Sequence, residues 1–394
     1  MYLQLTPEEE RFQYEVHQFL LEQDMGKIIR GFELANSWEE VGEESRQFLQ
    51  ELVQKGWLTI SWPKEFGGQG QSNTLLFILM NELGYFEMSP SDFVAGIGSS
   101  FIFGPLLMRY GTEEVKRELL PSVAKCEVGF CLGWSEPDSG SDLASVKTRA
   151  EDKGDYYLVN GQKTFGTATH FATHQIFLAR TNPDVAKHRG LSVMITELKS
   201  PGITVRPLRT MGNHRLNEVY FDDVRVPKKY LLGKENEGWR FTVEELDLER
   251  MLEPGLIKRI LDELVGYVKG TKRNGKLLAK DPLIRQELAE LAIEFELANL
   301  LFLRIAWILD QGKIPSTEIS MEKVFVSELW QRAADLGTRI LGLQGVLEED
   351  SKWAPLSGLI ARLYQRSVGR TIYMGTSEIQ RSIVATTGLG LPRG

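Results

Sequence analysis

The chain has 394 residues, of which 42% are hydrophobic and 25% are charged, as in an ordinary globular protein. At roughly 150 residues per domain, this length predicts two or three domains with substantial cores. The formal net charge of −8 argues against a protein that binds nucleic acid over a broad surface. The only cysteines, Cys126 and Cys131, are too few for a disulfide framework, and we expect both to be buried apolar side chains.

The sequence contains no clear signal for export, membrane insertion or metal binding. Its first residues lack the basic region and the apolar stretch of a secretory signal, and no run approaches the roughly 18 apolar residues of a membrane span. His170 and His174 lie four residues apart without a third ligand nearby, so we expect a hairpin or surface role for them. We therefore expect a cytoplasmic protein with no membrane insertion and no metal site.

The first part of the chain is predicted to be helical. Residues Thr6–Glu9 form a capping box with proline at the first helical position, and Ser37–Glu40 start a second helix in the same way. Gly56 is placed to end this second helix. A glycine-rich loop over residues 62–70 follows, and a helical pattern then resumes over residues 74–124.

Near residue 126 the hydrophobic period changes from helical to strand-like. Asn160-Gly161 lies between two strand-like runs and predicts a hairpin, and further short β-rich runs follow to Val226. From Gly238 the helical period returns and continues almost to the end. The pattern predicts a multi-domain α+β protein. Its expected parts are an N-terminal all-α domain over 1–125, a central β domain over 126–236 and a C-terminal α-helical domain over 237–394.

Three segments contain residue types that suit a ligand site. In residues 131–142, glycine and serine would let backbone amides approach a ligand, and Trp134 offers a flat face to a planar ring. Thr164–Thr167 places an aromatic side chain beside a hydroxyl donor. Gly375–Glu378 opens a helix whose free amides would suit a phosphate or an electron-rich ring edge. Taken singly, each has a simpler structural alternative: a domain-linking turn, a packed hairpin end and a capping box.

Together these segments resemble the acyl-CoA dehydrogenase family. Ser135–Asp142 (SEPDSGSD) is similar to one family signature, and Gly375–Arg381 (GTSEIQR) is similar to the other. Asn217–Pro227, Gly161–Lys163 and Pro63–Gly70 resemble further family segments, in the same order along the chain. The resemblance implies an N-terminal helical domain, a central β-barrel-like domain and a C-terminal four-helix bundle.

The resemblance also implies a reaction. The expected enzyme is an oxidoreductase of CH–CH groups in fatty acid metabolism, a flavoprotein that removes two hydrogens from the α and β carbons of a coenzyme A thioester. A glutamate would take the α proton, N5 of FAD would accept the β hydride, and an electron-transferring flavoprotein would receive the electrons. The implied assembly is a homotetramer, or a heterotetramer with a related subunit.

Two alternatives to this activity are open. One is a family member with oxidase or reductase chemistry. The other is a non-catalytic or half-site subunit of a heteromeric acyl-CoA dehydrogenase. The sequence does not specify the acyl group.

By the same resemblance, site residues can be assigned to positions in this chain. Those implied to contact FAD are Leu132, Trp134, Ser135, Ser141, Phe165, Thr167, Thr376 and Glu378. Those implied to contact the acyl-CoA are Ser141, Asp247, Arg250 and Tyr373.

The catalytic carboxylate needs a separate argument. Many family members carry it in Tyr-Glu-Gly-Thr, where this chain has Met374, and methionine cannot accept a proton. Isovaleryl-CoA dehydrogenase resembles this case, because its base lies in a Leu-Asp-Leu-Glu-Arg stretch that recurs here at Leu246–Arg250. We therefore predict Glu249 as the base. Glu245 and Glu253 would share its helical face and suit a charged solvent surface, with a bend at Pro254-Gly255.

A second departure concerns the half of the flavin site that many members donate to a neighbouring subunit. The family's Arg-Lys-Thr-Phe-Gly is replaced by Thr271–Gly275 (TKRNG). Arg339–Leu343 also lacks the usual glutamine-initiated Gly-Gly turn. The chain could therefore be one half of a pair of unlike subunits that share each flavin site, as in some bacterial relatives, and the choice between a homo- and a hetero-oligomer stays open.

Overall fold

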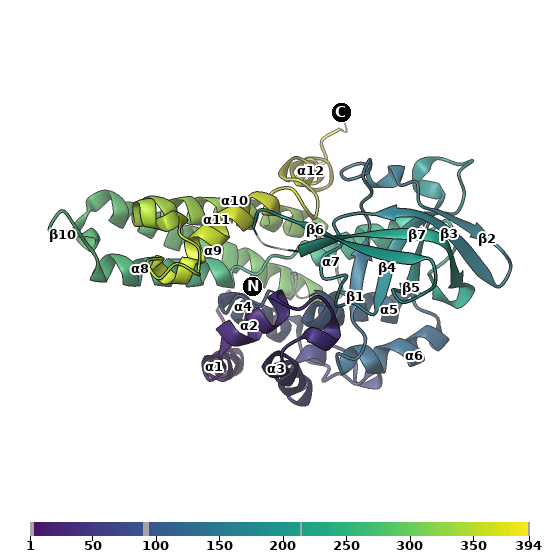
Figure 1. The fold of residues 1–394 in the computed structure, drawn as a ribbon, viewed down its shortest axis with the longest axis horizontal. Helices are drawn as coiled ribbons and strands as arrows, with labels where there is room; N and C mark the ends of the chain where they lie inside the picture. The colour runs from purple at the N-terminus through teal and green to yellow at the C-terminus, as the bar shows by residue number, and fades with distance from the viewer. Residues whose placement is uncertain (1–3, 90–93, 213–214, 393–394) are drawn as a thin grey trace. The chain divides into compact units, whose positions relative to one another are not determined.

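The computed structural model describes residues 4–89, 94–212 and 215–392. They divide into two compact units, each of which draws on separate stretches of the chain (Figure 1). Unit 1 consists of residues 1–22, 73–88 and 250–394, and unit 2 consists of residues 23–72 and 89–249. The predicted α+β class is confirmed. The boundaries predicted after residues 125 and 236 stay a prediction.

Unit 2 is built around a mixed sheet. Its strands are β1 (Phe130–Gly133), β2 (Arg149–Asp152), β3 (Tyr156–Lys163), β4 (His174–Arg180), β5 (Leu191–Glu197), β6 (Ile203–Arg209), β7 (Arg215–Pro227) and β8 (Leu231–Leu232). They are hydrogen-bonded in the order β6-β7-β3-β2-β4-β5-β8, and β1 pairs with β4 in parallel. Over the described strands this order is an open path, so the central domain is not a closed barrel.

The hairpin predicted at Asn160-Gly161 is wrong. Both residues lie inside the continuous strand β3, and the register against β7 shifts between Val159 and Gly161. A Cβ atom on Gly161 would lie 2.7 Å from the Cα of Thr148, so glycine is required by the close approach of a second chain segment. The Asn-Gly pair therefore marks a β-bulge and not a turn.

Helices of unit 2 accompany this sheet. They are α2 (Met25–Glu33), α3 (Glu43–Gln54), the π-helix η4 (Val94–Phe103), α5 (Gly104–Tyr110), α6 (Glu113–Ala124) and α7 (Gly238–Glu249). Gly56 adopts the left-handed conformation after α3, as predicted. The helix predicted to start at Ser37 starts instead at Glu43, because the Ser37 side chain makes no capping hydrogen bond and only a short 3-10 turn forms there.

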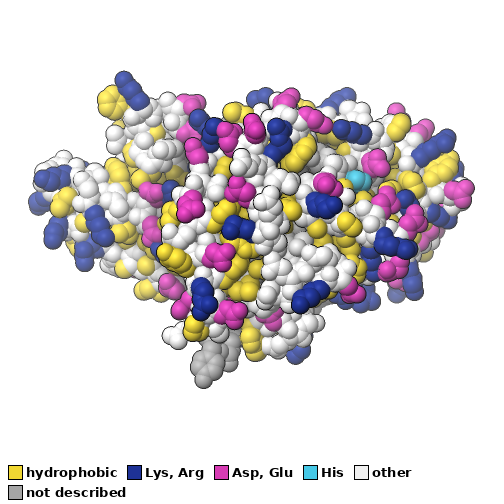
Figure 2. Space-filling view, turned by 90° about the horizontal axis from the view of Figure 1, so that it is seen from below, with side chains coloured by type: hydrophobic (Ala, Val, Ile, Leu, Met, Phe, Trp, Pro, Cys, Tyr) yellow, Lys and Arg dark blue, Asp and Glu magenta, His cyan; other side chains and the backbone are white. Residues whose placement is uncertain are grey.

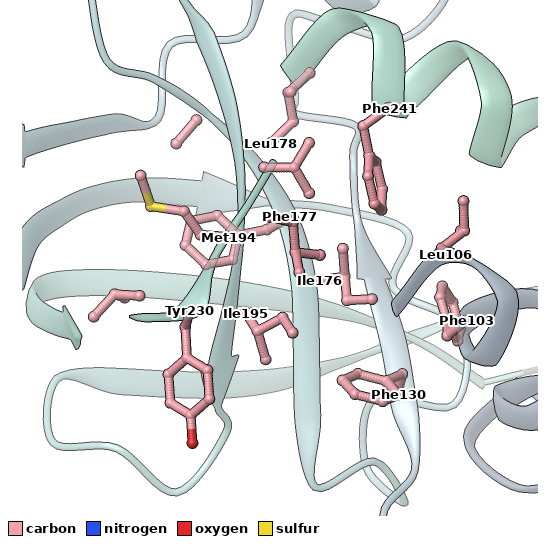
Figure 3. Packing of buried hydrophobic residues seen from close by; sticks show 14 of the residues in the cluster. Phe103, Leu106, Phe130, Ile176, Phe177, Leu178, Met194, Ile195, Tyr230 and Phe241 are labelled. Carbon is pink, nitrogen blue, oxygen red and sulfur yellow. The ribbon is translucent and has the colours of Figure 1, made fainter. Parts of the chain in front are cut away.

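The core of unit 2 lies between the sheet and the helices η4, α5, α6 and α7 (Figure 3). Phe130 of β1, Phe177 of β4 and Phe241 of α7 are buried together there. Burial of each large apolar side chain contributes about 1.5–3 kcal/mol. The start of α7 packs directly on β5, because a Cβ atom on Gly238 would lie 2.7 Å from the Cα of Ser192. This contact fixes the helix that carries Glu249.

Unit 1 is helical. Its helices are α1 (Pro7–Leu21), α4 (Asn73–Tyr85), α8 (Gly255–Gly270), α9 (Pro282–Leu309), α10 (Ser316–Leu341), α11 (Leu359–Arg370) and α12 (Ser377–Ile383), and a short hairpin joins β9 (Lys272–Arg273) to β10 (Lys276–Leu277). The predicted capping box at Thr6 is present. Helices α8 to α11 run lengthwise beside one another and enclose one apolar core, as expected for the C-terminal bundle (Figure 1).

The surface carries charges of both signs. On the face drawn in Figure 2, Lys and Arg side chains are interspersed with Asp and Glu and do not form a basic stripe. None of the helices that the structure describes is long and apolar enough to cross a membrane. Cys126 and Cys131 are both buried, as predicted, and burial raises the pKa of each thiol to about 12.

Candidate functional site

The signature loop that follows β1 is held by the carboxylate of Glu136. Its oxygens accept hydrogen bonds from the backbone amides of Lys147 (2.6 Å) and Thr148 (2.9 Å) and from Nζ of Lys163 (2.8 Å). Glu136 and Ser139 also exchange two backbone hydrogen bonds of 3.0 Å. Burial opposes ionisation of Glu136, but Lys163 and the hydrogen bonds outweigh it and lower the pKa of this carboxyl. The buried Glu136 carboxylate therefore holds the loop in place through these hydrogen bonds.

Lys163, the last residue of β3, is buried beneath this loop. It donates to Glu136 and, at 3.2 Å, to the carbonyl of Trp134. Burial lowers the pKa of Lys163 to about 8, and the carboxylate of Glu136 limits the shift. Sequence reasoning missed this pair, although a signal was present. Side chains alternate between the two faces of a strand, and Lys163 lies an even number of residues from the inward-facing Tyr157 and Val159. It therefore falls on the same, buried face.

Two of the three predicted ligand segments lie side by side in unit 2. The amide of Thr164 donates to the carbonyl of Ser135 at 2.9 Å, which joins the segment after β3 to the segment after β1. Buried Asn217 holds Gly166 through two hydrogen bonds. The backbone carbonyl of Asn217 accepts from the Gly166 amide (2.8 Å), and its side-chain Nδ2 donates to the Gly166 carbonyl (3.0 Å). Leu132, Ser135 and Thr167 are half-buried along these segments.

Phe165 is the most exposed aromatic side chain of this group. Its side chain is 59% exposed, and its backbone is in the left-handed region with φ of 61°. A left-handed conformation is uncommon for a bulky residue and is often found at functional sites. The conformation turns an apolar ring outward from the strand end, where a flat ligand could lie against it.

Trp134 occupies a different environment from the one predicted. Its ring is 7% exposed and packs in the apolar core, 6.4 Å from the ring of Phe241 and tilted by 67°. Its Nε1 donates to Oε2 of Glu245 at 2.7 Å. The flat face predicted to receive a ligand ring is therefore covered by core side chains. The groups of this segment nearest the surface are Leu132 and Ser135.

The three glutamates of the predicted base region do not share an exposed face. Glu245 of α7 is fully buried, and Glu253 is also buried, so the charged solvent surface predicted for them is wrong. Helix α7 ends at Glu249, and residues 250–254 leave the helical path before α8 begins at Gly255. Glu249 is half-buried at the helix end. It is the member of the three whose position suits contact with a ligand.

Ser141 and Asp247, the remaining predicted substrate contacts of unit 2, differ in exposure. Ser141 is exposed beside Asp142, which pairs with Lys187 at 2.7 Å. Asp247 on α7 is buried. Ser141 is therefore accessible to a ligand, whereas Asp247 serves the packing around the helix that carries Glu249.

In unit 1, Arg250 holds the turn where many family members carry their base. Its Nε donates to the carbonyl of Met374 at 3.1 Å, and Arg250 itself is buried. Met374 and Gly375 both adopt left-handed conformations, with φ of 56° and 82°. The Met374 side chain packs against the apolar core of the bundle. Neighbouring Tyr373 is 42% exposed, so it is the side chain of this turn that faces outward.

Thr376 and Glu378 line a hollow of about 410 Å³ on unit 1. Thr376 caps α12 through the amide of Ile379, and Arg381 pairs with Glu328 at 2.7 Å. The amide of Glu378 and the Thr376 hydroxyl hold the pKa of the Glu378 carboxyl below its usual range. The hydroxyl of Thr376 and the carboxylate of Glu378 can hydrogen-bond the hydroxyl groups of a sugar or polyol chain.

The two segments that depart from the family pattern for the donated half of the flavin site, Thr271–Gly275 and Arg339–Leu343, lie together. Arg273 of the β9–β10 hairpin donates to the carbonyl of Ile340 at 2.5 Å, beside the turn at Gly342. Gly342 has a φ of 64°, which favours glycine. The altered sequence therefore still places an arginine against the glycine turn that follows α10.

The chain is similar to known proteins over nearly its whole length. Models of the acyl-CoA dehydrogenase N-terminal, middle and C-terminal domains match residues 6–127, 131–224 and 236–389. Acyl-CoA dehydrogenase FadE26 of Mycobacterium tuberculosis is 34% identical over 371 residues, which cover 90% of this chain and 89% of the relative.

Two solved structures are similar over their whole length. The Tcur3481-Tcur3483 steroid ACAD matches with a TM-score of 0.90 and 28% identity, and 100% of each chain is covered. The ChsE4-ChsE5 complex from Mycobacterium tuberculosis matches with a TM-score of 0.88 and 31% identity, again over 100% of each chain. The similarity therefore includes every element that carries the candidate site.

Proposed function

Because the chain belongs to the acyl-CoA dehydrogenase family, we propose that this oxidoreductase binds FAD and dehydrogenates an acyl-CoA thioester between its α and β carbons. The observation that carries the proposal is the junction in unit 2, where Ser135 and Thr164 are hydrogen-bonded and bring two flavin segments of the family together. When bound, FAD would supply the acceptor for the β hydride.

Each unit, taken by itself, has residues that suit part of that cofactor. Leu132, Ser135, Phe165 and Thr167 offer an apolar ring and hydroxyl donors at one edge of unit 2, which suits a flavin ring. The hollow at Thr376 and Glu378 in unit 1 suits its ribityl and adenosine parts. We propose that Ser141 also contacts FAD and that Trp134 contacts it through its backbone.

Glu249 would take the α proton. A general base must reach the proton as a carboxylate, and Glu249 ends α7 in a half-buried position. Met374 offers no proton acceptor at the other family position, and its side chain packs into the bundle core. Buried Arg250 directly follows Glu249 and donates to the Met374 carbonyl, and Asp247, also buried, lies two residues before Glu249. Tyr373, exposed on its turn, would contact the acyl group.

We further propose that the working enzyme pairs with a related subunit. One of the similar solved structures is the ChsE4-ChsE5 complex, and the donated half of the flavin site departs from the family pattern in Thr271–Gly275. The acyl group proposed is a bulky, polycyclic one, because one of the similar solved structures is a steroid ACAD. An electron-transferring flavoprotein is the proposed electron acceptor.

A panel of acyl-CoAs tests the proposed function. Straight-chain, branched and steroid-derived thioesters would be offered with an artificial electron acceptor, with and without candidate partner subunits. We expect dehydrogenation of at least one thioester and a requirement for bound FAD. Protein that holds FAD but oxidises none of the thioesters in any combination would favour the alternative of a half-site subunit.

A further inference from the structure

Helix α10 carries two adjacent ionisable side chains inside unit 1, and the proposed mechanism does not use either of them. Glu322 and Lys323 are both fully buried in the middle of the bundle. Buried charged groups are costly unless hydrogen bonds satisfy them. Each of these residues makes such a bond to backbone outside helix α10, and the two bonds reach different segments.

Glu322 holds the segment that follows Arg250. Its Oε2 accepts the backbone amide of Leu252 at 3.3 Å, at a place where the chain has left α7 and has not yet entered α8. No residue in the part of the chain that the structure describes lies within hydrogen-bond distance of its Oε1. Leu252 is itself fully buried, so this bond anchors the linker from inside.

Burial disfavours the charged form of the Glu322 carboxyl. Burial raises the pKa of its carboxyl well above the usual range, and nearby Glu253 adds to the rise. The Leu252 amide, Lys323 and Arg370 oppose the shift without cancelling it. A protonated carboxyl keeps a carbonyl oxygen that can accept the Leu252 amide, and glutamine has the same shape and the same acceptor.

Lys323 holds the turn at Met374–Gly375. Its Nζ donates to the carbonyl of Gly375 at 2.7 Å, while Arg250 and Gln380 donate to the carbonyl of Met374 at 3.1 and 3.2 Å. Both turn residues are left-handed, so these carbonyls lie outside any helix ladder and depend on side-chain donors. A Cβ atom on Gly375 would lie 2.2 Å from Nε2 of Gln380, so the turn closes tightly over its donors.

The two anchored segments are joined to each other through Arg250. Arg250 begins the linker that Glu322 holds and donates to the turn that Lys323 holds. Glu249, the proposed base, directly precedes Arg250 in the chain. One rigid helix therefore fixes the linker after the base and the turn that carries Tyr373.

We propose that Glu322 and Lys323 are positioning residues, which set the place of Glu249 and Tyr373 by holding the backbone at Leu252 and Gly375. The proposal rests on the proposed function. Both residues would act through the two segments that they hold. A displacement of about 1 Å at a reacting group can reduce the rate of a reaction 10²-fold, so loss of either anchor should reduce kcat more than it raises KM.

Four variants test this proposal. Glu322→Leu and Lys323→Met remove one anchor each, and Glu322→Gln keeps the acceptor for the Leu252 amide. Met321→Gln changes the preceding, partly exposed residue of α10 and is the matched control. Each purified protein would be assayed for melting temperature, FAD content, kcat and KM. In the same proteins without ligand, hydrogen exchange would be followed by mass spectrometry in peptides that cover residues 250–254 and 372–377.

The expected results separate positioning from mere stability. Glu322→Leu should speed exchange mainly in the first peptide and Lys323→Met mainly in the second, and both should lower kcat about 10- to 100-fold with KM changed less than about threefold. Glu322→Gln and Met321→Gln should match the wild type in hydrogen exchange, kcat and KM. If Glu322→Leu fails to fold, Lys323→Met and Glu322→Gln still test whether the two residues position the segments.

Several results would overturn the proposal. They are wild-type kcat in Lys323→Met, unchanged exchange in both peptides, or a Glu322→Gln variant as impaired as Glu322→Leu. If wild-type protein oxidises no acyl-CoA, the proposed function fails on its own, and the exchange measurements still decide whether the two anchors exist.

Discussion

The Nε1 of Trp134 donates to the carboxylate of Glu245 at 2.7 Å, and both side chains are buried in unit 2. This bond ties the signature loop after β1 to α7, the helix that ends in Glu249. Loss of the acceptor should leave a buried indole N–H unpaired, which typically costs about 1–3 kcal/mol.

Substitution of Glu245 should therefore depend on shape and hydrogen bonding. Glu245→Gln keeps an acceptor oxygen and should unfold at nearly the wild-type denaturant concentration, whereas Glu245→Leu should lose about 1–3 kcal/mol of unfolding free energy. Equilibrium denaturation followed by far-UV circular dichroism measures the difference. Equal stability of the two variants would show that the bond to Trp134 contributes nothing.

The Glu136–Lys163 pair should make unit 2 sensitive to acid. The folded-state pKa of Glu136 is lowered, so its contribution is fully present above the unfolded pKa of about 4.3 and is lost as pH falls through the folded value. The melting temperature of the wild type should therefore fall more steeply below about pH 4.3 than that of Glu136→Gln. Calorimetry over this range checks the prediction, and parallel curves for the two proteins would refute it.

Glu322 should have the opposite pH dependence. Its folded-state pKa is raised, so above about pH 4.3 the unfolded chain has lost a proton that the folded chain retains, and stability falls as pH rises. Glu322→Gln cannot titrate. Its melting temperature relative to the wild type should therefore rise between pH 5 and pH 8, as measured by thermal denaturation. A constant difference would mean that Glu322 is ionised in the folded protein.

Much of the fold could be predicted because its signals are local. The capping box at Thr6 and the left-handed Gly56 depend only on neighbouring residues, and both were predicted correctly. The Asn160-Gly161 hairpin failed because the glycine is required by Thr148, which is distant in the sequence. The burial of Glu245 could not be predicted either, since its partner Trp134 lies 111 residues away. Lys163 was predictable from strand parity.

Flavin binding should be measurable on the protein alone. The two segments joined at Ser135 and Thr164 predict absorbance near one equivalent of FAD per chain after purification. Spectra before and after protein denaturation give this ratio. Colourless protein that also fails to take up added FAD would contradict the prediction, unless a partner subunit restores binding, which would show that the flavin site is shared.

The assembly is predicted to be a tetramer, either of four copies or of two unlike pairs. Arg273 lies against the turn at Gly342, where family members donate groups to a neighbouring flavin, and this placement supports a shared site. Light scattering on the pure protein, and on mixtures with candidate partners, measures the mass. A stable monomer that holds FAD and is fully active would contradict a shared site.

The most direct test of the central claim is the flavin reduction rate of Glu249→Gln on mixing with an active acyl-CoA in the absence of oxygen. The substitution preserves shape and removes the proton acceptor, and loss of a general base typically costs about 10²–10⁴-fold in rate. Because Glu253 is buried, the matched control is Glu296→Gln, which changes an exposed carboxylate of α9. Glu249→Gln should bind FAD and thioester but scarcely bleach the flavin, while Glu296→Gln should match the wild type. A wild-type reduction rate in Glu249→Gln would contradict the assignment of the base.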